Sequence, residues 1–255
     1  MEDKKATIIA LTGKGGVGKT SLSALIVRLL SETYPEKKVL AIDADPAVGL
    51  ATALGVDVAS TVDDIRKLFI NAVEDGNTKK AIEMLGEAKF QLFDALVEMN
   101  NISFLAIGRP EAAGCYCKVN AYLKEVISMI ANSFDYVVID GEAGIEQVNR
   151  RVMEKVTHLI LVSDASKKGL KVVQTIHSVA KELTMFEKAG VIVNRMPDMS
   201  FVDTIDAGDI PILTCIPDDK LMSLSDMKGD SVLELSSDSS IYKGAKEALQ
   251  KLNII

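Results

Sequence analysis

Gly13-Lys14-Gly15-Gly16-Val17-Gly18-Lys19-Thr20 is the stretch that decides the fold of this 255-residue chain. Its spacing, Gly-x-x-x-x-Gly-Lys-Thr, is that of a phosphate-binding loop, and it lies between a buried apolar run at 6–11 and a helical pattern that begins near Gly18. Glycines allow successive backbone N–H groups to turn inward around phosphates, at the positive end of the following helix. The stretch therefore predicts a site for a nucleoside triphosphate.

Two side chains of the loop add specific chemistry. Lys19 is expected to place a point charge on the β- and γ-phosphates, and the Thr20 hydroxyl to ligate Mg²⁺. We expect bound ATP or ADP with Mg²⁺, and ATP hydrolysis. The residues expected to contact the nucleotide here are Gly13, Lys14, Gly15, Gly16, Val17, Gly18, Lys19, Thr20 and Ser21.

Short apolar runs recur along the rest of the chain and alternate with helical patterns. Such runs suit strands buried on both faces, and the alternation predicts an α/β fold with a mostly parallel central β-sheet and helices on both faces. The expected strands are 6–11, 39–42, 102–107, 136–139, 159–162, 191–193 and 212–216; helices are expected at 21–30 and 119–130. Ligands of such sheets bind at the carboxyl ends of the strands.

A mainly helical insertion is expected at about 57–100, within a single domain that spans 1–255. Residues 61–64 form the pattern of a helix capping box, and Lys79–Met99 has the pattern of one long amphipathic helix. We find no repeat, Pro-rich linker or low-complexity tract that would mark a domain boundary.

The amino-acid composition of the chain limits the kinds of partner that we expect it to bind. The net charge is −7 and no dense Lys/Arg run is present, which argues against nucleic acid as a partner. No run of 18 apolar residues and no signal-peptide pattern is present, so we expect a cytoplasmic protein without a membrane anchor.

Acidic residues follow two of the expected strands, and an amide follows a third. Asp43 and Asp45 end the run at 39–42, and Asp140 ends the run at 136–139. Carboxylates at these positions can hold Mg²⁺ or orient water, although acids at strand ends also cap turns. Asn194 ends the run at 191–193, where an amide could pair with the edge of adenine, and Pro217 could form another wall of that pocket.

The three cysteines include a closely spaced pair, Cys115 and Cys117, in a Gly-rich and charged loop before an expected helix. A helix N-terminus and neighbouring Lys118 favour thiolates, and soft thiolates suit Zn²⁺, Ni²⁺ or an iron–sulfur cluster. Two thiolates are half of a tetrahedral site, which a twofold homodimer would complete. The alternative is a pair of inert buried cysteines; Cys215, in an apolar run, is expected to be core packing.

The extra lysine, Lys14, makes the loop resemble the deviant Walker A loop of the partition, septum-site and nitrogenase-iron-protein class of ATPases. In that class this lysine reaches the partner's nucleotide across a dimer interface, which implies catalytic roles for Lys14, Lys19 and Asp45. The resemblance also implies that Asp45 orients water, that Asp43 and Asp140 are outer-shell magnesium groups, and that Gly144 belongs to a nucleotide-sensing switch. A solvated loop lysine is the alternative for Lys14.

The whole chain resembles the nickel-inserting maturation ATPases of carbon monoxide dehydrogenase and acetyl-CoA synthase. The stretches that carry this resemblance are the 13–20 loop, Asp-Ala-Asp-Pro at 43–46, Gly-Cys-Tyr-Cys at 114–117, 140–146 and Val-Ser-Asp-Ala-Ser at 162–166. The resemblance implies a homodimeric metallochaperone that delivers nickel to one of these client enzymes. An iron–sulfur reductase and a partition or positioning ATPase are the alternatives.

Overall fold

The computed structural model describes residues 6–74, 87–108, 117–141, 152, 155–183 and 185–255. Within them, eight strands form one sheet in the order β3-β4-β2-β5-β1-β6-β7-β8, parallel except for the β3–β4 pair. The strands are β1 Thr7–Gly13, β2 Val39–Asp43, β3 Val97–Met99, β4 Ile102–Ala106, β5 Tyr136–Asp140, β6 Val156–Ser163, β7 Phe186–Met196 and β8 Ile212–Pro217. The expected α/β fold with a mostly parallel sheet is confirmed.

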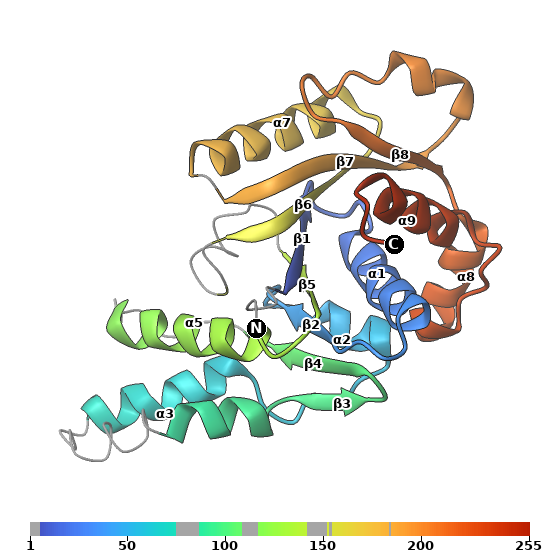
Figure 1. Cartoon of the computed structure of the whole chain (residues 1–255). Helices are drawn as coiled ribbons and strands as arrows, with labels where there is room; N and C mark the ends of the chain where they lie inside the picture. Colours follow the sequence, from blue (N-terminus) through green and yellow to red (C-terminus); the bar gives the residue numbers. More distant parts are fainter. Residues whose placement is uncertain (1–5, 75–86, 109–116, 142–151, 153–154, 184) are drawn as a thin grey trace.

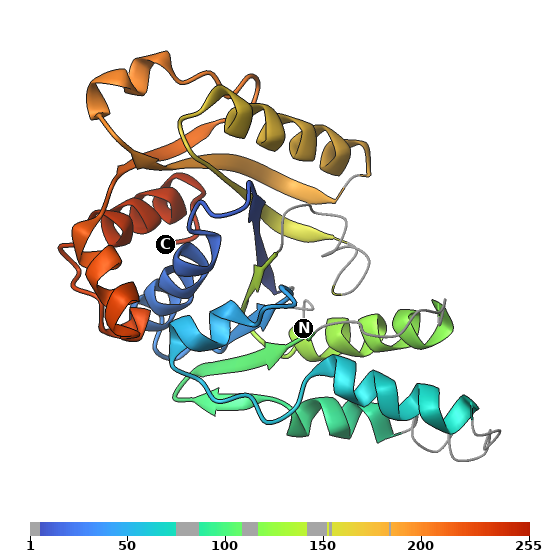
Figure 2. The same ribbon diagram turned by 180° about the vertical axis from the view of Figure 1, so that it is seen from behind.

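Helices cover both faces of the sheet (Figures 1 and 2). One face carries α1 Lys19–Thr33, α2 Gly49–Leu54, η2 Val232–Glu234 and α9 Ser240–Lys251, and the other carries α3 Val62–Glu74, a helical segment at 87–94, α5 Cys117–Ala131 and α7 Lys167–Glu182. The turn η1 Met199–Thr204 precedes β8, and α8 Lys220–Lys228 follows it.

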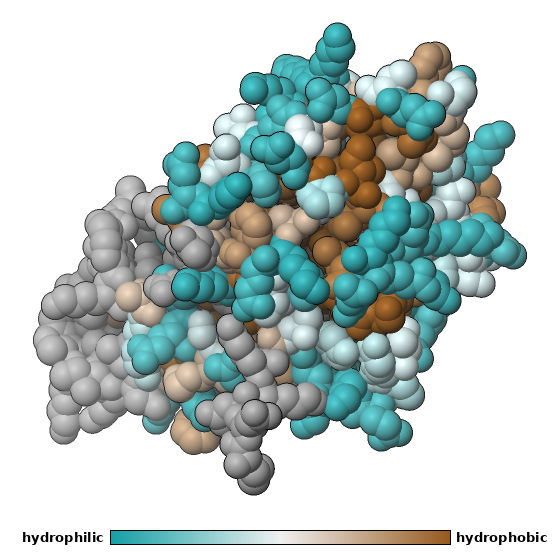
Figure 3. Space-filling model, turned by 45° about the horizontal axis from the view of Figure 1, so that its top comes forward, coloured by the Kyte–Doolittle hydropathy of each residue, from teal (hydrophilic) through white to brown (hydrophobic). Residues whose placement is uncertain are grey.

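Two apolar cores, one on each face, follow from the alternation of side chains along the strands. In β1, Ile9 and Leu11 pack with α1 and α9, whereas Ile8 and Ala10 pack with α5 and α7. The apolar band that Figure 3 shows between hydrophilic residues lies on the surface, whereas the two cores lie beneath the helices. The sheet is thus buried on both faces, and its strand ends are left to form the site.

The expected helix at Lys79–Met99 is wrong at its C-terminal end. Helix is described at 87–94, and the chain then forms β3, which pairs antiparallel with β4 (79–86 lie outside the described residues). Asn100 and Asn101 make the two-residue turn between them, with Asn100 at φ +52. Asn tolerates this left-handed conformation, so Asn-Asn was a hairpin signal that the helical pattern obscured.

The capping box of the insertion is present. The Asp64 carboxylate accepts from the backbone N–H of Thr61 at 3.0 Å, and the Thr61 hydroxyl accepts from the Asp64 N–H at 3.2 Å. These bonds satisfy N–H groups that the start of α3 leaves without helical partners.

Candidate active site

The phosphate loop leaves β1 between β5 and β6, because β1 pairs with both. Gly13 has φ +144, and a Cβ there would lie 2.1 Å from the carbonyl oxygen of Val162 in β6, so only glycine fits. The Lys14 N–H donates to the same oxygen at 3.1 Å. Gly18, with φ +89, is the N-cap of α1. The loop therefore meets the start of a 15-residue helix, the end that attracts anions.

The two lysines of the loop have different partners. Lys19 Nζ donates to the carbonyl oxygen of Lys14 at 3.0 Å, across the inside of the loop. Lys14 Nζ instead forms an ion pair and hydrogen bond with Asp164, just after β6. Burial alone would raise the pKa of Asp164, but hydrogen bonds from Lys14 and Ser166 hold it below its usual value. Lys14 is thus neutralised within its own chain, a partner that the sequence did not reveal.

Asp140, at the end of β5, is hydrogen-bonded to residues at the start of α1, directly after the phosphate loop. It accepts hydrogen bonds from the hydroxyls of Thr20 and Ser23, both at 2.8 Å. Asp140 is 1% exposed, and burial raises its pKa although the Thr20 and Ser23 bonds lower it. Ser23, one turn into α1, was not expected in the site.

Asp43, at the end of β2, is fully buried, and its two carboxylate oxygens accept from the N–H groups of Asp45 at 3.0 Å and Leu50 at 2.8 Å. Desolvation and the neighbouring Asp140 raise the pKa of Asp43 to about 7. Two buried carboxyls whose pKa values are both raised, beside a threonine hydroxyl, fit a nearby Mg²⁺, whose charge would favour both ionised forms. We therefore expect Thr20 to ligate Mg²⁺ and the two acids to hold its water shell.

Asp45 is only partly buried and closes a turn, in which its Oδ1 accepts from the Ala47 N–H at 2.8 Å. The turn leads through Val48, whose φ of +52 is unusual for a β-branched residue, to α2. The water-orienting role of Asp45 remains a prediction.

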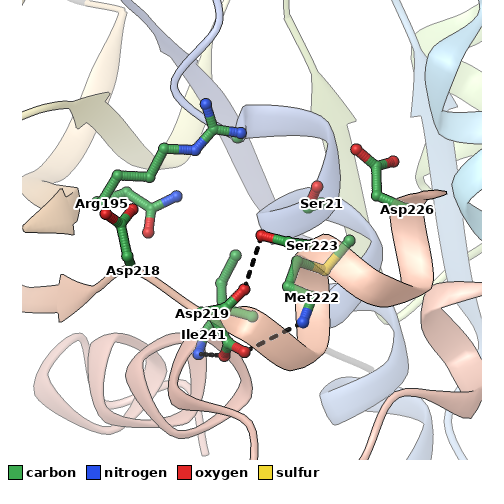
Figure 4. A pocket seen from close by; sticks show the side chains of 10 residues that line it. Ser21, Arg195, Asp218, Asp219, Met222, Ser223, Asp226 and Ile241 are labelled. Atoms are coloured by element: carbon green, nitrogen blue, oxygen red, sulfur yellow. Dashed lines mark hydrogen bonds between the residues drawn. The ribbon is translucent and has the colours of Figure 1, made fainter.

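A pocket beyond the loop lies where the base of a nucleotide is expected. It is lined by Gly18, Ser21, Asn194, Arg195, Asp218, Asp219, Met222, Ser223, Asp226 and Ile241. Figure 4 shows Arg195 and Asp218 on one side and the α8 residues Met222, Ser223 and Asp226 on the other. Asn194 lines this pocket and Pro217 ends β8 beside the lining residue Asp218, so their contacts with adenine remain predictions.

Asp219 builds the floor of this pocket. Its carboxylate caps α8 by accepting from the N–H groups of Leu221 and Met222, and it also accepts from the Ser239 hydroxyl and the Ile241 N–H at the start of α9. Partial burial would raise the pKa of Asp219, but these bonds hold it below its usual value. An Asp before a helical pattern is an N-cap signal, so its cap role was readable in the sequence, but its link to α9 was not.

The expected metal-binding pair is only partly covered by the structure. Cys115 and the switch glycine, Gly144, lie outside the described residues, and of Cys117 only the backbone at the start of α5 is described. In the described ranges, no group of three or more His, Cys, Asp or Glu side chains is suited to hold a metal ion. Cys215 is half-buried in the edge strand β8 and packs against the apolar core, as expected.

None of the helices in the described part of the chain combines the length and the apolar composition that a membrane crossing needs.

Similarity to known proteins assigns the chain to a family. The model of the AAA domain family AAA_31 matches residues 6–189. An uncharacterized ATP-binding protein of Methanocaldococcus jannaschii is 35% identical over 96% of this chain and 98% of its own. The carbon monoxide dehydrogenase accessory protein CooC of Rhodospirillum rubrum is 30% identical, over 89% of this chain and 90% of its own.

Solved structures agree on the fold. The septum site-determining protein MinD of Pyrococcus horikoshii, complexed with Mg-ADP, has a TM-score of 0.69 at 24% identity and covers 97% of this chain and 96% of its own. A ParA family ATPase of Chlorobium tepidum has a TM-score of 0.70 at 23% identity, over 96% and 98% of the two chains. The chain therefore belongs to the AAA domain family AAA_31 and is a P-loop ATPase, with the fold of the ParA and MinD structures.

Proposed function

We propose that this ATPase is a metallochaperone that binds nickel, or zinc in its place, through Cys115 and Cys117 at a homodimer interface. It would assist nickel insertion into carbon monoxide dehydrogenase or acetyl-CoA synthase. The observation that carries the proposal is the Cys-Tyr-Cys sequence in a chain similar over nine-tenths of its length to a carbon monoxide dehydrogenase accessory protein.

The position of the pair supports metal binding. The 15-residue helix α5 begins at Cys117, and Cys115 is two residues earlier in the sequence. The positive end of the helix favours thiolates, the form that binds soft metal ions. Two thiolates are too few for a tetrahedral ion, and a second copy related by a twofold axis would supply the other two.

The state of Lys14 supports a two-chain ATPase. In the single chain, Asp164 neutralises this lysine, so the ion pair has to open before Lys14 can reach another nucleotide. We propose that closure of the dimer replaces Asp164 by the phosphates of the partner's ATP. Mg²⁺, held by Thr20 with Asp43 and Asp140, would supply positive charge to those phosphates.

Hydrolysis would then change the metal site. Loss of the γ-phosphate removes the group that draws Lys14 across the interface, so the two chains would separate and the four thiolates with them. Nickel would be held in one nucleotide state and released in the other.

A metal titration tests the proposal. Anaerobically purified protein should bind about one nickel or zinc ion per two chains, since a tetrahedral site needs two cysteine pairs. The Cys115→Ser/Cys117→Ser variant should lose this binding, whereas the matched Cys215→Ser variant should keep it. Unchanged binding in the double variant would overturn the proposal. A brown protein with iron–sulfur absorbance would do so in favour of a reductase.

A further inference from the structure

The phosphate loop has an outer side as well as an inner one. A loop that turns its N–H groups toward phosphates also has carbonyl oxygens on its outer side, and those oxygens need partners of their own. Two of them are bound by adjacent residues of β7. Asn194 Nδ2 donates to the carbonyl oxygen of Val17 at 2.8 Å, and Arg195 Nη1 donates to that of Gly16 at 2.9 Å.

Adjacent residues of a regular strand point to opposite faces, so one strand does not normally grip one loop with two consecutive side chains. Here the register of β7 against β8 shifts between Val193 and Met196. Arg195 has φ +57, the left-handed region that non-glycine residues rarely adopt. This irregularity brings both side chains to the phosphate loop.

The two donors differ in their surroundings. Asn194 is 3% exposed, and its amide nitrogen would lie 2.7 Å from a Cβ at Gly18, so the loop passes directly over it. Arg195 is exposed and lines the mouth of the base pocket (Figure 4). The Asn194 Nδ2 donates to the carbonyl oxygen of Val17. The Asn194 Oδ1 is therefore the atom of this amide that we expect to accept a hydrogen bond from a base.

We infer that Arg195 is a positioning residue of the ATPase reaction. With Asn194 it forms a clamp on the outward carbonyls of Gly16 and Val17 and so holds the loop in its phosphate-binding shape before the nucleotide arrives. The same two residues line the base pocket, and the clamp therefore couples occupation of that pocket to the geometry of the phosphate loop. The inference concerns ATP binding by one chain and does not depend on the metal.

An exposed arginine near a phosphate site could instead act only as a charge that attracts ATP. The two roles differ before any nucleotide is present. A clamp protects the loop in the nucleotide-free protein, whereas a charge that acts on phosphates leaves the free loop unchanged.

The experiment compares three variants by hydrogen exchange and by nucleotide binding. Arg195→Met removes the donor and the charge, Arg195→Lys keeps both, and Lys220→Ala, an exposed lysine at the start of α8, is the control. In the nucleotide-free protein, Arg195→Met should speed exchange in the peptide that contains residues 13–18. It should also weaken ATP and ADP binding by about five- to tenfold, the factor expected for one partly exposed hydrogen bond from a charged donor.

The expected pattern is recovery of most of both effects in Arg195→Lys and no effect in Lys220→Ala, with adenosine binding much less affected than ATP binding. Weaker ATP binding with unchanged exchange in the free protein would overturn the clamp in favour of a phosphate-attracting charge. Unchanged exchange and unchanged binding would also overturn it. Should Arg195→Met fail to fold, Arg195→Gly adopts φ +57 without strain, removes the same contact and is held to the same outcomes.

Discussion

The phosphate end and the base end of the nucleotide site are built in opposite ways. At the phosphate end, charged groups are already paired within the chain: Lys14 with Asp164, and Asp140 with Thr20. At the base end, Asn194, Arg195 and residues of α1, α8 and α9 line an open pocket. ATP must therefore exchange partners at the phosphate end, whereas at the base end it enters a pocket that is already formed. We infer that the phosphate end changes its contacts when ATP binds, whereas the base end is already formed before ATP binds.

Lys19→Ala should break the phosphate end and leave the base end intact. Without the ammonium group that bridges the inside of the loop, ATP hydrolysis should fall by at least about a hundredfold, as for loss of other transition-state charge donors. Phosphate release measures the loss, and binding of adenosine shows whether the pocket survives. Retained hydrolysis would show that Lys19 is not needed for the reaction. Lost adenosine binding would show that the base pocket depends on the phosphate loop.

Asp219→Asn should loosen the base end, with a smaller effect. Both carboxylate oxygens accept hydrogen bonds, and an amide would replace one of these acceptors by a donor. The free energy of unfolding near neutral pH should therefore fall by about 1 kcal/mol. Because the pKa of Asp219 is lower in the folded protein, its stabilisation is present above the pKa of an unfolded Asp and is lost as the pH falls through the folded pKa.

The difference in stability between wild type and Asp219→Asn should therefore stay constant from about pH 7 to pH 5 and shrink at lower pH. Urea unfolding followed by circular dichroism measures it, and Asp226→Asn, an exposed acid on the same helix, is the matched control. A difference that grows as the pH falls would contradict the assignment of Asp219 as an ionised cap.

The two ends also differ in how well the sequence predicts them. The phosphate loop makes its site from eight consecutive residues and the backbone groups between them, so its spacing alone predicts both the loop and the helix that follows. Asp43 and Asp140 were predictable because parallel strands bring their carboxyl ends to one edge.

The partners that were missed come from far along the chain. Asp164 is 150 residues from Lys14, and Arg195 is 179 residues from Gly16, and both are ordinary residue types at strand ends. Only the strand order, with β6 beside β1 and an irregular β7 beyond it, brings them to the loop. Local sequence patterns do not predict the order of strands in the sheet.

In the proposed dimer, Lys14 completes the nucleotide site of a second copy of the chain. Lys14→Ala keeps an intact loop but offers no lysine to its partner, and should lose turnover more than ATP binding. Lys19→Ala offers Lys14 but has a broken loop.

Mixing the two inactive variants is the most direct test. Half of the dimers should then contain one complete site, and phosphate release should recover to about a quarter of the wild-type rate per chain, as random pairing in a twofold dimer requires. A mixture no more active than the sum of the separate variants would show that Lys14 acts within its own chain, and would contradict its proposed role across the dimer interface.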